Sequence, residues 1–236
     1  MLSIVATPIG NLGDMTPRAL DALRAADIVA CEDTRRTWAL LTHFGIPRPA
    51  DLLSYRQGNE ERVGERLIAA LQAGRQVVLC SDGGCPGLSD PGYRLIQRAA
   101  ELDLPMTLLP GASAVTTALV LSGLPTSSFT FKGFPPRKPG ALLRFFADEA
   151  ESPHTLVLFE APYRLAPTLA AALQALGERR AALCLELTKL HEQVRRGWLS
   201  ELRSACDAAP PKGEAALVIA GNHPKFRKPR PDSAPA

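Results

Sequence analysis

Short runs of aliphatic and β-branched residues alternate along this chain with amphipathic stretches of helical period, and this alternation constrains the fold more than any other feature. The runs that predict strands lie at residues 2–6, 28–31, 52–55, 76–80, 106–109, 129–134, 155–159, 182–185 and 215–220. Six helices are predicted: one that begins at residue 16, one that ends at 41, one over 59–71, one around 95–99, one that ends at 121 and one over 164–176. Strands that alternate with helices are typical of a largely parallel α/β sheet.

A cluster of residues that break regular structure, Ser122-Gly123-Leu124-Pro125, divides the chain near its middle. We therefore predict two α/β lobes, residues 1–123 and 124–223. Residues 224–236 are proline-rich and hold four cations against one carboxylate, which predicts a basic, disordered tail. Because this tail carries the net charge of +3, the body is formally neutral, and the overall charge does not identify a nucleic-acid-binding protein.

The composition excludes several classes of protein. Hydrophobic residues make up 46% of the chain and charged residues 22%, so the chain can bury a core. Its apolar runs are shorter than the roughly 20 residues of a membrane span, and its start does not resemble a secretion signal. Five scattered cysteines and four histidines show neither a disulfide framework nor metal-ligand spacing. We expect a cytoplasmic protein with no membrane contact and no metal.

Glycine, proline and polar residues gather where the predicted strands end, which is where open α/β sheets bind ligands. These loops lie at residues 8–10, 32–35, 82–86, 110–113 and 186–189. Glycines allow the backbone to approach a ligand closely, although such loops are about as often turns without ligands. The fingerprints of dinucleotide-binding proteins, P-loop phosphotransferases and α/β hydrolases are all absent. A ligand would therefore be held by a less common set of loops.

Taken together and in order, these loops resemble the ribosomal RNA small subunit methyltransferase I family, a branch of the tetrapyrrole methylase superfamily. The motifs that carry the resemblance are Ala6-Thr7-Pro8-Ile9-Gly10-Asn11, Glu32-Asp33-Thr34-Arg35, Asn59-Glu60, Ser81-Asp82-Gly83-Gly84, Asp90-Pro91-Gly92, Pro110-Gly111-Ala112-Ser113-Ala114, Ser122-Gly123-Leu124-Pro125 and Glu186-Leu187-Thr188-Lys189. They span residues 2–223, nearly the whole chain. This chain resembles a short member of the family, without its small helical C-terminal domain.

The resemblance implies two α/β lobes of the tetrapyrrole methylase type, with S-adenosylmethionine in the cleft between them, in a homodimer. It implies methyl transfer to the ribose 2′-hydroxyl of a cytidine in 16S rRNA of the small ribosomal subunit. The residues that it places at the cofactor are Pro8, Asp82, Gly83, Gly84, Cys85, Leu88, Ser113, Ala114, Glu160, Leu187 and Thr188. Cys85 stands where the family usually has a threonine, so its side chain lacks that hydrogen-bonding hydroxyl.

Methyl transfer to a hydroxyl requires alignment of the acceptor and removal of its proton. The candidates for the base are Glu32, Asp33 and Lys189, since each lies on a strand-end loop. Asp33 is equally well explained by an ion pair with Arg35, and Lys189 somewhat better by a contact with an RNA phosphate. The candidates for contact with the substrate are Arg35, Arg36, Asn59, Glu60, Arg137 and Lys138.

Several residues have competing interpretations. Tyr55 and Tyr163 are candidates for stacking on a base, but core packing is the commoner role of a tyrosine near a strand. Asp90 is interpreted as the cap of the helix after Pro91. Two alternative functions remain: a methylase of the same fold that acts on a tetrapyrrole-like or other small molecule, and a non-enzymatic module that binds the cofactor.

Overall fold

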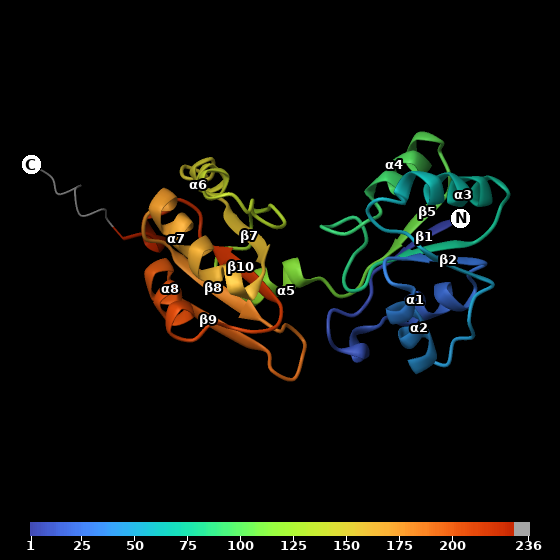
Figure 1. Ribbon diagram of the computed structural model, residues 1–236, viewed down its shortest axis with the longest axis horizontal. Helices are drawn as coiled ribbons and strands as arrows, with labels where there is room; N and C mark the ends of the chain where they lie inside the picture. The colour runs from blue at the N-terminus through green and yellow to red at the C-terminus, as the bar shows by residue number, and fades with distance from the viewer. Residues whose placement is uncertain (229–236) are drawn as a thin grey trace, which may run out of the picture. The chain divides into compact units, whose positions relative to one another are not determined.

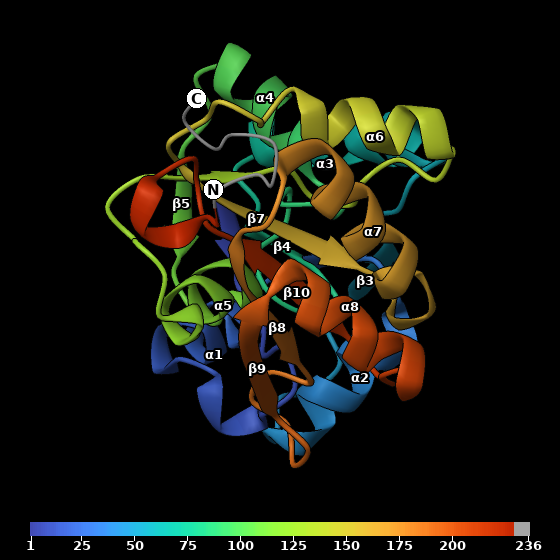
Figure 2. The same ribbon diagram turned by 90° about the vertical axis from the view of Figure 1, so that its left-hand side faces the viewer.

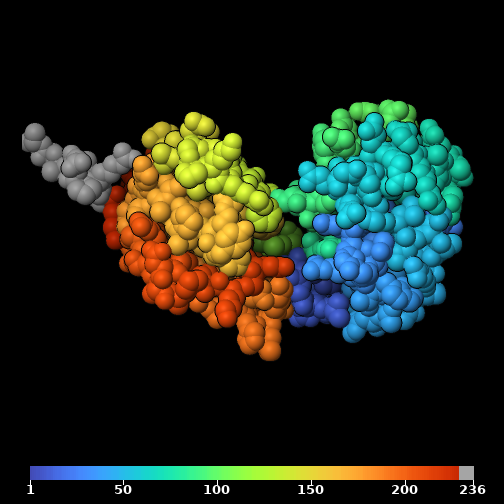
Figure 3. Space-filling model, in the orientation of Figure 1, coloured from blue at the N-terminus to red at the C-terminus, as the bar shows by residue number. Residues whose placement is uncertain are grey.

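The computed structural model describes residues 1–228, which form two compact units divided between Ser113 and Ala114 (Figure 1). Each unit is closely packed in the space-filling view (Figure 3). Within the described residues, no helix is both long enough and apolar enough to cross a membrane.

The first unit contains a parallel sheet of five strands in the order β3-β2-β4-β1-β5. Its strands are β1 (Leu2–Val5), β2 (Ile28–Cys31), β3 (Asp51–Ser54), β4 (Val77–Cys80) and β5 (Met106–Leu109). Its helices are η1 (Leu12–Asp14), α1 (Pro17–Arg24), α2 (Thr34–His43), α3 (Glu60–Gln72) and α4 (Tyr93–Glu101). Residues of α3 and α4 join one apolar cluster with the strands, and residues of α1 and α2 join another, so apolar helices cover both faces of the sheet.

The parallel topology determines where the polar loops of the first unit meet. Since every strand runs in the same direction, the loops that follow β1, β2, β4 and β5 emerge at one edge of the sheet. Local sequence helps to begin the helices there: the Thr16 side chain accepts a hydrogen bond at the start of α1, with proline at the next position. Asp33 caps α2 in the same way, by accepting a hydrogen bond from the Arg35 amide.

The second unit contains a mixed sheet of five strands in the order β6-β7-β10-β8-β9, in which β6 and β7 alone are parallel. Its strands are β6 (Phe129–Phe131), β7 (Thr155–Glu160), β8 (Arg180–Leu185), β9 (Gln193–Trp198) and β10 (Ala215–Ile219). Its helices are α5 (Ala114–Ser122), α6 (Pro139–Ala147), η2 (Pro162–Arg164), α7 (Leu165–Leu176), α8 (Leu199–Ala208) and η3 (Pro224–Phe226). Residues of α6, α7 and α8 share one core with the sheet, and α5 packs on β7, β8 and β10 (Figure 2).

The second unit differs from the expectation in three respects. Its sheet is mostly antiparallel, and β9, α6 and α8 were not expected. The helix α5 belongs to this unit, which places the division at residue 113, earlier than the expected 123, because α5 packs against the second sheet. Residues 224–228 were expected to be disordered, but backbone contacts hold them to the unit. Arg227 forms an isolated antiparallel β-bridge with Arg179, and the Lys228 amide donates a hydrogen bond to Glu178 O at 3.0 Å. The rest of the expected tail, 229–236, lies outside the described residues.

Candidate functional site

The loops after β1 and β4 are joined by their backbones. The amides of Thr7 and Gly84 each donate to the carbonyl of the other at 2.9 Å. Two hydroxyls reinforce the junction: Thr7 Oγ1 donates to Ser81 O, and Ser81 Oγ donates to Gly84 O, both at 3.1 Å. Because both hydroxyl residues are buried, these bonds are shielded from water, and the two loops form one rigid strand-end surface.

Glycines allow three of these loops to come together. A Cβ atom on Gly83 would lie 3.3 Å from Pro8 O, and one on Gly111 would lie 3.2 Å from Ala6 O. Gly84 has φ of 85°, which an L side chain rarely adopts. The loops after β1, β4 and β5 therefore pack against one another backbone to backbone, and we call these three joined loops the cradle.

Of the residues expected at the cofactor, five lie in this cradle or beside it in the first unit. Pro8, Asp82, Gly83, Gly84 and Cys85 come from the joined loops after β1 and β4. Cys85 is half-buried, and burial raises the pKa of its thiol, so it acts here as a neutral group.

Three further residues expected at the cofactor are exposed Leu88 of the first unit and the pair Ser113 and Ala114 at the division between the units. Leu88 is 49% exposed. Ser113 is the last residue of the first unit, and Ala114 is the first residue of α5, so this motif joins the two units.

Three carboxylates, Glu32, Asp82 and Asp90, interact beyond the ends of β2 and β4. Burial, followed by repulsion from Asp82, raises the pKa of Glu32. Burial, followed by repulsion from Glu32, raises the pKa of Asp90 to about 6, although a hydrogen bond from Ser81 opposes this rise. A carboxylate with its pKa raised toward neutrality is a better match for proton abstraction than an ordinary one.

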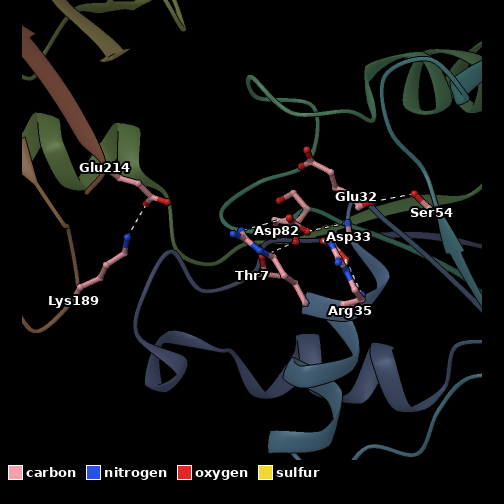
Figure 4. A network of polar contacts seen from close by, with 10 residues as sticks. Thr7, Glu32, Asp33, Arg35, Ser54, Asp82, Lys189 and Glu214 are labelled. Carbon is pink, nitrogen blue, oxygen red and sulfur yellow. Dashed lines mark hydrogen bonds and ion pairs between the residues drawn. The ribbon is translucent and has the colours of Figure 1, made fainter. Parts of the chain in front are cut away.

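The carboxylate of Asp33, one of the expected bases, is engaged in hydrogen bonds and an ion pair with Arg35 (Figure 4). Its Oδ1 accepts hydrogen bonds from the backbone amide of Arg35 at 2.9 Å and from Arg35 Nε at 3.0 Å. Its Oδ2 accepts one from Arg35 Nη2 at 2.7 Å. These hydrogen bonds hold the pKa of Asp33 well below its usual range. The ion-pair interpretation thus fits the geometry, whereas a group so acidic is a poor base.

Asp82 links the loops that follow β2 and β4. Its Oδ1 accepts from the Asp33 amide at 3.0 Å, and its Oδ2 lies 3.5 Å from the Arg36 guanidinium (Figure 4). Arg35 and Arg36, two of the arginines expected to contact the substrate, therefore have carboxylate partners within the first unit.

Asp90 is the candidate that sequence reasoning missed, because it was interpreted as a helix cap. The structure corrects this interpretation: Gly92 occupies the N-cap position of α4, and no side chain caps that helix. Asp90 instead faces Ser81 and the other carboxylates. No sequence pattern indicates this proximity, since Glu32 and Asp90 come from loops far apart in the chain.

Lys189, the third expected base, is held between two carboxylates of the second unit (Figure 4). Its Nζ lies 3.1 Å from Glu186 Oε1 and 2.9 Å from Glu214 Oε2. Burial alone would lower the pKa of Lys189, but the hydrogen bonds with Glu214 and Glu186 outweigh it and the pKa is raised. Lys189 is therefore protonated near neutral pH, which fits a cationic contact better than a base.

The loop of the second unit that contains Leu187 and Thr188 has unusual backbone geometry. Glu186 has φ of 49° and Thr188 has φ of 64°, a region that a β-branched residue rarely adopts. Leu187 between them is buried. The Thr188 hydroxyl is buried with no hydrogen-bond partner among the described residues. A strained backbone beside an unsatisfied buried hydroxyl is typical of a ligand-binding position.

Glu160 does not have a carboxylate available for a cofactor. Its side chain is fully buried, accepts from the Ala161 amide at 2.8 Å and from the Thr168 hydroxyl at 2.6 Å, and lies 3.5 Å from the Arg164 guanidinium. The carboxylate of Glu160 is therefore used internally, and a contact of this residue with the cofactor, which stays a prediction, would involve its backbone.

The remaining candidates for substrate contact divide into two kinds. Asn59 is structural: it accepts from the Arg56 amide and donates to Ser54 O, both at 2.9 Å, and Glu60 begins α3 after it. Arg137 and Lys138 are exposed, and no hydrogen bond or ion pair among residues 1–228 engages their side chains. Arg137 and Lys138 are thus available to a partner.

Two other expectations concern tyrosine and metal. Tyr55 is 1% exposed and packs in the core, whereas Tyr163 is 77% exposed. Among residues 1–228, no group of three histidine, cysteine or acidic side chains is placed to hold a metal ion.

Comparison with known proteins gives consistent results. The family model described as "Tetrapyrrole (Corrin/Porphyrin) Methylases" matches residues 1–203. Proteins named ribosomal RNA small subunit methyltransferase I are similar to the chain: that of Mesorhizobium japonicum is 47% identical over 97% of this chain and 78% of its own. That of Synechocystis sp. is 44% identical over 96% of this chain and 81% of its own.

Solved structures show the same fold at low identity. A uroporphyrin-III-C-methyltransferase from Thermus thermophilus is 23% identical, with a TM-score of 0.62 over 93% of both chains. A diphthine synthase is 16% identical, with a TM-score of 0.69 over 93% of this chain and 89% of its own. Below 25% identity, these structures establish the fold alone.

Proposed function

Because this chain belongs to the ribosomal RNA small subunit methyltransferase I family of tetrapyrrole methylases, we propose that it methylates 16S rRNA of the small ribosomal subunit with S-adenosylmethionine as the methyl donor. The observation that carries the proposal is the identity of 44% or more to such methyltransferases across nearly the whole chain. The acceptor that we propose is the ribose 2′-hydroxyl of a cytidine, and the proposed assembly is a homodimer.

Two features of the structure fit the cofactor. The cradle of Pro8, Gly83 and Gly111 offers backbone groups without intervening Cβ atoms, as a compact polar ligand requires. The unsatisfied hydroxyl of Thr188, beside Leu187, offers a hydrogen-bonding group that has no internal use. When bound, S-adenosylmethionine supplies an electrophilic methyl group.

The chain's own contribution is to orient the acceptor and remove its proton. We assign removal of the acceptor's proton to Glu32. The other two candidates are less suited, because Asp33 is paired with Arg35 and Lys189 is held in its charged form. Burial, followed by repulsion from neighbouring carboxylates, raises the pKa of Glu32, so its carboxylate has a greater affinity for a proton than that of an ordinary glutamate. We assign Arg137 and Lys138 to phosphates of the RNA, since neither side chain is used internally.

The test is transfer of tritium from labelled S-adenosylmethionine to small ribosomal subunits purified from a strain that lacks this gene. We expect one labelled cytidine, resistant to alkaline cleavage on its 3′ side because its 2′-hydroxyl is blocked. Glu32→Gln should lower kcat by about 10² or more while retaining cofactor binding, as expected for loss of a general base. Absence of label from the wild-type protein, despite cofactor binding in calorimetry, would exclude the proposed substrate.

A further inference from the structure

The segment between β6 and α6 carries exposed groups that no contact inside the second unit explains. From Lys132 to Arg144, which lies in α6, the sequence contains four cations and no acidic residue; of these, Lys132 pairs with Glu149 at 2.8 Å. Arg137, Lys138 and Arg144 are all exposed. The segment is therefore a local concentration of positive charge on a body whose overall charge is close to zero.

Two aromatic side chains stand beside these cations. Phe134 is 60% exposed, although its ring leans on Phe159 with centroids 5.6 Å apart. Tyr163, on η2, is 77% exposed. Aromatic rings that lie exposed together can serve as stacking surfaces, and here two of them belong to neighbouring loops.

Arg164 fastens these two loops together. Its guanidinium donates to Pro136 O at 2.8 Å and to Pro135 O at 3.4 Å, and it also lies 3.5 Å from the carboxylate of Glu160. That carboxylate is fully buried and fixed by Thr168, as described above. The segment after Phe134 is thus anchored to the end of β7 through a buried ion pair rather than left free.

The anchored loop is also stiffened by its composition. Pro135, Pro136 and Pro139 restrict the backbone on both sides of Arg137 and Lys138. A loop that is already ordered loses less conformational entropy when it binds. Rigid aromatic rings with flanking cations and no acidic groups are the combination by which proteins hold single-stranded nucleic acid, through base stacking and phosphate contacts.

We propose that Phe134 and Tyr163 stack on bases of a single-stranded segment of the rRNA substrate, with Arg137 and Lys138 on its phosphates, and that Arg164 is a positioning residue that holds this platform. The inference rests on the proposed function and adds to it the surface that engages the RNA. A structured duplex is excluded as the ligand, because its bases are stacked on one another and offer no free face to the rings.

The test measures KM for small ribosomal subunits, with cofactor affinity followed by calorimetry. Phe134→Ala and Tyr163→Ala should each raise KM about tenfold, as expected for loss of one stacked base, and leave cofactor affinity and kcat unchanged. Phe129→Ala is the matched control, because Phe129 is an aromatic residue at the other end of β6 that is 42% exposed. Arg164→Gln should raise KM in the same way while kcat persists, which general destabilisation would not produce.

A second measurement uses naked RNA. Fluorescence anisotropy of a labelled oligocytidylate should show binding that both alanine variants weaken, and binding should be lost when the strand is paired with oligoguanylate. Wild-type KM in both alanine variants, with the wild-type enzyme active, would overturn the platform and leave the proposed function intact. If the two alanine variants show a raised KM for ribosomal subunits but bind oligocytidylate as tightly as the wild type, the rings contact a ribosomal protein instead. That result would also overturn the proposed RNA-stacking platform. An inactive wild-type enzyme would instead refute the proposed function.

Discussion

Replacing Asp90 with asparagine should stabilise the protein at neutral pH, because the structure holds this carboxylate where its charge is unfavourable. Burial and repulsion from Glu32 raise the pKa of Asp90 from 3.8 to about 6. At about 1.36 kcal/mol per pKa unit, that rise costs the ionised protein about 3 kcal/mol of folding free energy as an upper limit. Asp90 is partly exposed, so solvent screening reduces the expected gain in Asp90→Asn to about 1–2 kcal/mol.

The sign of the effect depends on pH in a defined way. Below the unfolded pKa of 3.8, Asp90 is protonated in both states, and the wild-type protein loses no stability through it. Between about pH 4 and about pH 6 the unfolded state has released this proton while the folded state retains it, so the wild-type protein loses stability as the pH rises, whereas the asparagine variant does not titrate. The difference between the two proteins should therefore grow from about pH 4 to about pH 7 and then remain constant.

Urea denaturation of both proteins at a series of pH values measures this difference directly. A companion variant, Ser81→Ala, removes the hydrogen bond that lowers the pKa of Asp90, so the transition should move to higher pH. The reasoning would be refuted by a stability difference between Asp90→Asn and wild type that is the same at all pH values. It would also be refuted if asparagine were the less stable residue above about pH 7.

Three further predictions follow from individual contacts. Gly83→Val should abolish cofactor binding in calorimetry while the circular dichroism stays unchanged, because the valine side chain would meet Pro8 O. Gly140→Ala is the neutral control, because a Cβ atom there meets nothing within 4 Å. Lys189→Arg should keep most of the activity and the wild-type pH–rate profile, because the charge matters there; a shifted profile would restore Lys189 as the base. Thr168→Val should lower the free energy of unfolding by about 1–3 kcal/mol in urea, since Glu160 loses a buried donor; an unchanged midpoint would contradict this.

The sequence was most informative where structure depends on local pattern. In the first unit, every expected strand is present. The three central strands β1, β2 and β4 are fully buried, and the edge strands β3 and β5 are also short, largely apolar runs that loops separate from the helices. In the second unit, β9 was missed because it is an edge strand with the polar sequence Gln193-Val194-Arg195-Arg196-Gly197-Trp198, which lacks a buried apolar run. The helix α6 was missed as well, although its Leu142 is buried in the core.

The parts of the candidate site that could be predicted from the sequence are those whose residues lie close together along the chain. The glycine loop, and the pairing of Asp33 with Arg35, both depend on short spacings. The raised pKa of Asp90 depends on its burial and on Glu32, and the internal use of the Glu160 carboxylate depends on Thr168 of α7; no local sequence pattern reveals either. Long-range electrostatics and burial are properties of the assembled fold.

The motif Pro110-Gly111-Ala112-Ser113-Ala114 has a consequence for how the chain tolerates changes in length. Only residues 110–113 separate the end of β5 from the start of α5, and the division between the units falls at Ser113. Gly111 packs against Ala6 within that short span. An inserted or deleted residue would therefore change the cradle and the connection between the units in a single event. Length-scanning mutagenesis should find this segment intolerant, although it lies between elements where loops ordinarily accept insertions.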